Sequence, residues 1–170
     1  MDVRLIPKDR KRRAFTAGMF DGLIYLVDTE AGTAVPVFDT ATINGSDMDM
    51  PQVLAITHDG RRLTFPLYRS GQIVMLDISK PERPKLLSVV NLGPGAGPHD
   101  IALTSDDKRL IATGYFLNQD DFGKIQLDGD RKVHILKVQH SKLELDTRFN
   151  LDFNTAFTTG PARPHGMASK

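Results

Sequence analysis

A short motif occurs three times along the chain and constrains its fold more than any other feature. Each copy has a proline, a polar residue and the start of an apolar run, and the polar residues are Gln52, His99 and His165. Pro51 and Pro98 lie 47 residues apart, and the first two copies stay in step through Arg62 and Arg109. A period near fifty residues with several short strands per unit is typical of propeller blades.

The repeat predicts an all-β fold of about three four-stranded antiparallel β-propeller blades. Turn-forming residues separate the strand-like runs and set the boundaries. We expect a basic, solvated lead-in over 1–13, then a partial blade over 14–49, a blade over 50–96, a blade over 97–159 with an inserted loop at 116–130, and the inner strand of a closing blade over 160–170.

Three blades cannot close a central channel, because known closed propellers have at least four. The partial blade over 14–49 has three predicted strands and lacks an inner one. We expect 160–170 to supply it, in this chain or in another copy. The incomplete propeller is then completed by homo-oligomerisation, or the chain is a fragment of a longer one.

The composition limits which partners and which metal ligands this chain can have, but it does not identify a reaction. The 170 residues have a formal net charge of +1, which favours neither nucleic acid nor a membrane surface as a partner. The chain has no cysteine, so a bound metal must use imidazole, carboxylate, thioether or water. We expect no signal peptide and no membrane-spanning run in this sequence, which leaves both periplasm and cytoplasm open.

Several segments resemble a known family. Gly97–Leu110 is similar to blade openings of the broad YVTN-type propellers. Pro81–Leu86, together with Lys142–Phe153, Gly160–Ala162 and His165, resembles the C-terminal third of the selenium-binding protein and methanethiol oxidase family. The resemblance covers most of this chain and only part of the family's length. It implies a copper-dependent oxidase that converts a small thiol with dioxygen into formaldehyde, hydrogen sulfide and hydrogen peroxide. The family's cysteine-bearing N-terminal region has no counterpart here, so no selenium site is carried over.

His99 and His165 are the candidate copper ligands, because both open predicted inner strands and the inner strands of a propeller line its channel. The alternative is a structural role in which each imidazole bonds a neighbouring blade's backbone. Asp100 is a candidate for orienting an imidazole. Gln52 and Met50 are expected to line the channel or to contact the ligands indirectly, and Met48 offers a second thioether.

The remaining histidines, His58, His134 and His140, are expected to be structural. The cluster Asn118–Asp121 lacks the spacing of a calcium loop and indicates a solvated turn. Two other function classes stay open: a non-catalytic binding scaffold, and a lactonase-like hydrolase that uses a divalent cation. The lactonase-like hydrolase needs carboxylates to hold its cation, and Asp100 is the sole carboxylate at a predicted inner-strand start.

Overall fold

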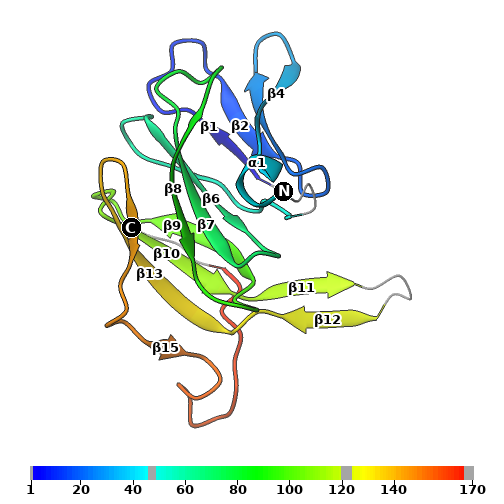
Figure 1. Cartoon of the computed structure of the whole chain (residues 1–170), viewed down its shortest axis with the longest axis vertical. Coiled ribbons are helices and arrows are strands. Elements are labelled where there is room, and N and C mark those ends of the chain that lie inside the picture. The colour runs from blue at the N-terminus through cyan, green and yellow to red at the C-terminus, as the bar shows by residue number, and fades with distance from the viewer. Residues whose placement is uncertain (1, 46–48, 120–123, 167–170) are drawn as a thin grey trace.

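The computed structural model describes residues 2–45, 49–119 and 124–166, which form three antiparallel sheets of four or five strands, a separate two-stranded hairpin and one short helix (Figure 1). The first sheet, blade 1, follows the chain in the order β1-β2-β3-β4. Its strands are β1 (Val3–Leu5), β2 (Ala14–Ala17), β3 (Leu23–Asp28) and β4 (Thr33–Asp39). Helix α1 (Ala41–Asn44) leads toward blade 2.

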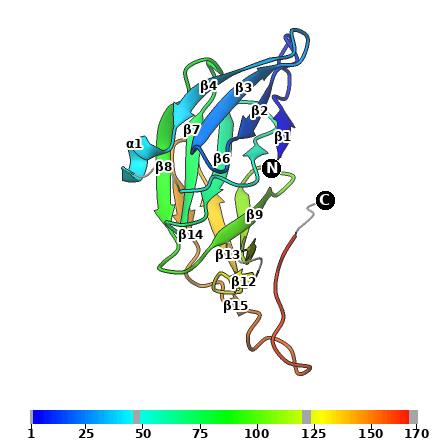
Figure 2. The ribbon, with the colours of Figure 1, turned by 90° about the vertical axis from the view of Figure 1, so that its right-hand side faces the viewer.

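Blades 2 and 3 repeat this meander. Blade 2 consists of β5 (Ala55–Ile56), β6 (Arg62–Leu67), β7 (Gln72–Asp77) and β8 (Lys85–Asn91). Blade 3 consists of β9 (Pro98–Leu103), β10 (Arg109–Gly114), β13 (Lys132–Val138) and β14 (Leu143–Leu145), with β15 (Leu151–Asp152) paired to the other half of β13. Figure 2 shows the sheets as successive layers. The predicted all-β fold of three propeller blades is confirmed, and the ring is not closed.

Apolar side chains fill the spaces between the blades. Alternation along β2 and β3 turns Phe15 and Leu26 toward blade 2, where they join Leu63 and Phe65 in one buried cluster. A second cluster joins Met75 and its neighbours on blade 2 to the facing side of blade 3. Burying each large side chain stabilises the fold by about 2 kcal/mol, so the two clusters hold the blades in register.

The structure corrects the expectation for the first 13 residues. Val3, Arg4 and Leu5 pair in register with β2, so β1 is the inner strand of blade 1 and the solvated part of this segment is limited to the exposed basic residues from Lys8 to Arg12. Ile6 is buried. The alternation of apolar and polar residues over 3–6 was hidden by the basic run that follows it.

Residues 160–166 form no strand, so the closing inner strand is also wrong for these residues, and β1 already occupies that place in blade 1. The inserted segment is not a loop throughout, because β11 (Phe116–Gln119) pairs with β12 (Ile125–Asp128) as a projecting hairpin (Figure 1). The outer edge of blade 3 consists of two short strands, β14 and β15, which both pair with β13. No helix among the described residues has both the length and the apolarity needed to cross a membrane.

Candidate channel site

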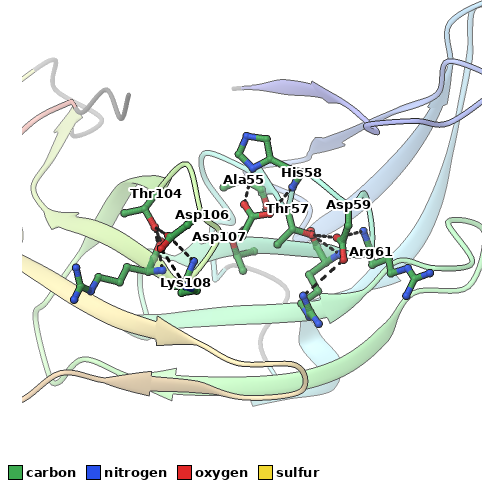
Figure 3. Close-up of polar contacts among 12 residues, drawn as sticks. Ala55, Thr57, His58, Asp59, Arg61, Thr104, Asp106, Asp107 and Lys108 are labelled. Atoms are coloured by element: carbon green, nitrogen blue, oxygen red, sulfur yellow. Dashed lines mark hydrogen bonds and ion pairs between the residues drawn. The ribbon is translucent and has the colours of Figure 1, made fainter.

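The turns that follow the first strands of blades 2 and 3 have the same hydrogen bonds (Figure 3). The Thr57 hydroxyl donates to Asp59 Oδ1 at 2.6 Å and accepts from the first amide of β6 at 3.1 Å. The Thr104 hydroxyl donates to Asp106 Oδ1 at 2.7 Å and accepts from the first amide of β10 at 3.1 Å. The sequence repeat is therefore a repeat of turn geometry, which fixes where each inner strand ends.

His58 connects these two turns across the blade boundary. Its amide donates to Asp107 Oδ2 at 2.8 Å, and its Nδ1 lies 2.8 Å from Asp107 Oδ1 (Figure 3). The His58 side chain is 70% exposed, as expected for a residue at a hairpin turn. Its role in the fold is to join blade 2 to blade 3.

The first strands of all three blades line one cavity of about 320 Å³. Its wall includes Arg4 and Leu5 of β1, residues 54–56 around β5, and residues 100–103 of β9. Strands far apart in the sequence thus share one concave surface, as the inner strands of a propeller share a channel. Its charged or titratable side chains are Arg4, His58 and Asp100.

Arg4 connects blade 1 to blade 2 at this wall. Its Nε donates to Asp2 Oδ2 at 2.6 Å and to the carbonyl oxygen of Leu54 at 3.0 Å. The amide of Leu54 donates to Asp2 Oδ2 at 3.3 Å. The ion pair of Asp2 and Arg4 therefore hydrogen-bonds both the amide and the carbonyl oxygen of Leu54, just before β5 begins.

His99 and His165 lie together, although His165 is not in the inner strand expected from the repeat. Their imidazole rings stack with centroids 5.3 Å apart and an angle of 20° between the planes. The Tyr115 ring meets His165 edge-on at 5.4 Å and 77°. Pro164 and Tyr115 are buried while His165 is exposed, so packing at its neighbours positions a ring that solvent can reach.

The surroundings of His99 lower its pKa. Burial holds the pKa of His99 below 6.5, electrostatic repulsion from the nearby His165 lowers it further, and the carboxylate of Asp100 acts in the opposite direction. His99 is therefore neutral at pH 7 and can offer a nitrogen lone pair to a metal ion.

Asp100 is near both the cavity and the segment that carries His165. It is one of the residues that line the cavity, and a Cβ added at Gly166 would be 3.6 Å from Asp100 Oδ2. The structure thus brings Asp100 beside the segment that carries His165.

Gln52 and Met50 make local contacts. Both are buried, and Gln52 Nε2 donates to the carbonyl oxygen of Met50 at 3.3 Å. The sulfur of Met50 accepts from Arg69 Nε at 3.3 Å. Met50 has a φ of 56°, so its backbone makes a sharp turn before β5. These contacts give both residues structural roles at the blade entry.

The other two predicted structural histidines also contact neighbouring side chains, one in its own blade and one in the preceding blade. His134 Nε2 lies 2.9 Å from Asp130 Oδ2, and His140 Nδ1 lies 2.9 Å from an Arg62 nitrogen. Across the described residues, no three His, Cys, Asp or Glu side chains form a group able to hold an ion. Met48, Asp120 and Asp121 lie outside the described residues.

Two residues at the site were missed from the sequence. Tyr115 occupies the same repeat position as Tyr68, and this recurrence was the sequence feature that could have marked Tyr115 as part of the site. Arg4 lies in the segment expected to be solvated, where the alternation of Val3, Arg4 and Leu5 indicated a strand.

No family model matches the chain. A curated relative, the protein NirF of Pseudomonas aeruginosa, is 28% identical over an alignment that covers 71% of this chain and 36% of that protein. Among solved structures, a hypothetical selenium-binding protein from Sulfolobus tokodaii matches 97% of this chain and 42% of its own length, with a TM-score of 0.69 and 20% identity. The periplasmic gluconolactonase of Pseudomonas aeruginosa matches 89% of this chain and 41% of its own length, with a TM-score of 0.63 and 15% identity.

The chain thus spans less than half the length of these relatives. At such identities the structural matches show the fold, and a fold hosts many functions. Together with the three sheets, they establish that the described residues form part of a β-propeller similar to a selenium-binding protein and to lactonase propellers.

Proposed function

We propose that this chain carries two imidazole ligands of a copper-dependent, oxidase-type propeller that acts on a small thiol. The observation that supports the proposal most is the stacking of His99 and His165, whose rings lie 5.3 Å apart although they come from different repeats. Both follow a proline in a copy of the repeated motif. The resemblance of the tail to the methanethiol oxidase family supplies the substrate class.

Imidazole is a suitable type of ligand for copper, but this chain supplies two imidazoles and a copper site needs further ligands. Imidazole is a good copper ligand, and the lowered pKa of His99 keeps it neutral at pH 7. Copper, when bound, would supply a site for a thiolate and for electron transfer to dioxygen. The residues of this chain would hold and orient it: His99 and His165 as ligands, and Tyr115 as the packing partner that fixes the His165 ring. Two imidazoles leave further positions for solvent, substrate or groups outside this chain.

Copper titration of the purified chain tests the proposal. We expect copper(II) to bind with an electron paramagnetic resonance spectrum that shows nitrogen ligation, and His99→Ala or His165→Ala to weaken binding by at least ~10-fold. The matched control is His140→Ala, which removes an imidazole contacted by Arg62 at a blade turn. Oxygen consumption with methanethiol then tests the reaction.

Copper binding of equal strength in the wild type and in the double histidine variant would contradict the proposal. Stoichiometric binding of calcium or manganese that is lost with Asp100→Asn and kept without the two histidines would favour the lactonase-like alternative. Absence of any stoichiometric metal would favour the binding scaffold.

A further inference from the structure

An arginine occupies the same position in every blade, at or directly before the start of the second strand. In each case its carbonyl oxygen accepts a hydrogen bond from the amide of the residue that follows the first strand, at 2.9 to 3.0 Å. The three accepting residues are Arg13, Arg62 and Arg109, and their donors are Ile6, Thr57 and Thr104. Because the same hydrogen bond recurs, the three arginines are structurally equivalent.

The first two arginines each reach the following blade. The guanidinium of Arg13 in blade 1 binds the carboxylate of Glu82 in blade 2. Arg62 Nε in blade 2 donates to the carbonyl oxygen of His140 in blade 3 at 2.8 Å. Glu82 and His140 both lie in the turn between the third and fourth strands of their blade. The repeat therefore includes a contact between blades that is made by this arginine.

Arg109 is the third copy of this arginine, and it is exposed. Within the described residues its guanidinium has no ion-pair partner. Arg109 and Ile111 alternate with Leu110 and Ala112, which are buried against blade 2. Arg109 thus lies on the side of blade 3 that faces away from blade 2, where the next blade of a propeller would pack.

Blade 1 has the complementary free face. Val3 and Leu5 of β1 are each 61% exposed, and through β2 they are in register with Tyr25 and Val27, on the side away from blade 2. The turn between β3 and β4 corresponds to the turns that hold Glu82 and His140. This turn carries an exposed acidic residue, Glu30.

The charge available in this turn is that of Glu30. Asp28 accepts hydrogen bonds from the amides of Glu30 and Ala31 at 3.0 and 2.9 Å, so its carboxylate holds the turn together. In the described part of the chain, the Glu30 carboxylate makes no ion pair. Glu30 is therefore placed to accept an arginine from a preceding blade, as Glu82 does from Arg13.

We propose that the free face of blade 3 docks on the free face of blade 1 of a second copy, with Arg109 of one chain bound to Glu30 of the other. Two chains of three blades each then close one ring around a twofold axis along the channel, and the contact is made twice. The second copy is favoured because the contact continues an interface that recurs within the chain and because the two charges are complementary. The proposal is independent of the metal site.

Light scattering on a size-exclusion column tests the proposal with the full chain. We expect the wild type to have twice the 18.8 kDa mass of one chain. Arg109→Glu or Glu30→Lys, each alone, places like charges at both contacts and should raise the dimer dissociation constant by about 10-fold or more. Lys80→Glu, which reverses an exposed charge in the β7–β8 turn, is the matched control and should remain dimeric.

An equimolar mixture of the two single variants is the decisive measurement. In a mixed dimer, the two substituted side chains meet at one contact with their charges exchanged, and Arg109 meets Glu30 at the other. Both contacts then join opposite charges, so the mixture should regain the dimer. Restoration also shows that neither variant is misfolded. A monomeric wild type, or a dimer that is insensitive to both reversals, would overturn the proposal; the first result would assign the free face to blades of a longer chain.

Discussion

His58 and Asp107 join blade 2 to blade 3 through two contacts of 2.8 Å, one to the backbone amide of His58 and one to its ring. The position of Asp107 in its turn corresponds to Gly60 in the preceding turn, and both have positive φ, 56° and 70°. The same backbone position thus carries a glycine at one blade boundary and a connecting carboxylate at the next.

Replacing Asp107 separates the backbone requirement from the contact between blades. Asp107→Gly keeps the favoured backbone and removes the carboxylate, and it should lower the free energy of unfolding by about 1 kcal/mol. Asp107→Asn tolerates the same φ and keeps one acceptor, so its loss should be about half as large. Urea unfolding measures both, and equal losses would show that the contact with His58 adds nothing.

Gly60 is required for space as well as for conformation. A Cβ at this position would be 2.4 Å from the carbonyl oxygen of Pro7, whereas a Cβ at Gly32, with a similar φ of 67°, would meet nothing within 4 Å. Gly32→Ala should therefore lose about 1 kcal/mol from backbone strain alone. Gly60→Ala should lose about 2 kcal/mol more, because blade 1 must shift away from blade 2. Similar losses by urea unfolding would refute the close packing at Gly60.

Acidification should weaken the fold through His99. Burial holds the pKa of His99 in the folded chain below 6.5, its value in the unfolded chain. Between the folded-state pKa and 6.5, the unfolded chain therefore binds more protons than the folded chain. Stability contributed by neutral His99 is present above 6.5 and is lost as the pH falls below it. His99→Gln should flatten the decline in unfolding free energy between about pH 7 and pH 5. An NMR titration of His99 that gives a pKa above 6.5 would contradict this account.

The pair of Asp9 and Arg13 should act at a lower pH. Hydrogen bonds from Arg13 lower the pKa of Asp9 to about 2 from 3.8, so the stability it contributes is complete above 3.8 and is lost as the pH falls through about 2. Both side chains are nearly buried, at 12% and 11% exposed. Asp9→Asn should therefore cost about 2 kcal/mol at pH 7.

Glu144→Gln provides the control for the Asp9 pair. It removes a carboxylate whose contact with Lys142 is 4.0 Å long and largely exposed, and it should cost less than about 0.5 kcal/mol. Equal effects of the two substitutions in urea unfolding would show that the Asp9 pair is no more than a surface contact.

The repeat was sufficient to predict three blades, because the position of an inner strand follows from counting residues between equivalent turns. The stacking of His99 with His165 has a different origin from the predicted one, since residues 160–166 form no strand. It could not place β1, since five basic residues between 8 and 13 hid the strand before them. The hairpin β11–β12 was missed because Asp, Asn and Gly dominate its composition. The position of Arg4 depends on which side of β1 faces blade 2, and the contact of Tyr115, between β10 and β11, depends on how the segment with His165 packs. Tertiary packing sets both.

The pairing of β1 with β2 also bears on how such a protein can change its size. Many ring-shaped folds are fastened by a sheet that takes strands from both ends of the polypeptide, so that removing one unit breaks another. Here blade 1 takes all four of its strands from consecutive residues, as blade 2 does. Gene duplication or deletion could therefore add or remove whole units at the boundaries between sheets without breaking the hydrogen bonds of any sheet that remains.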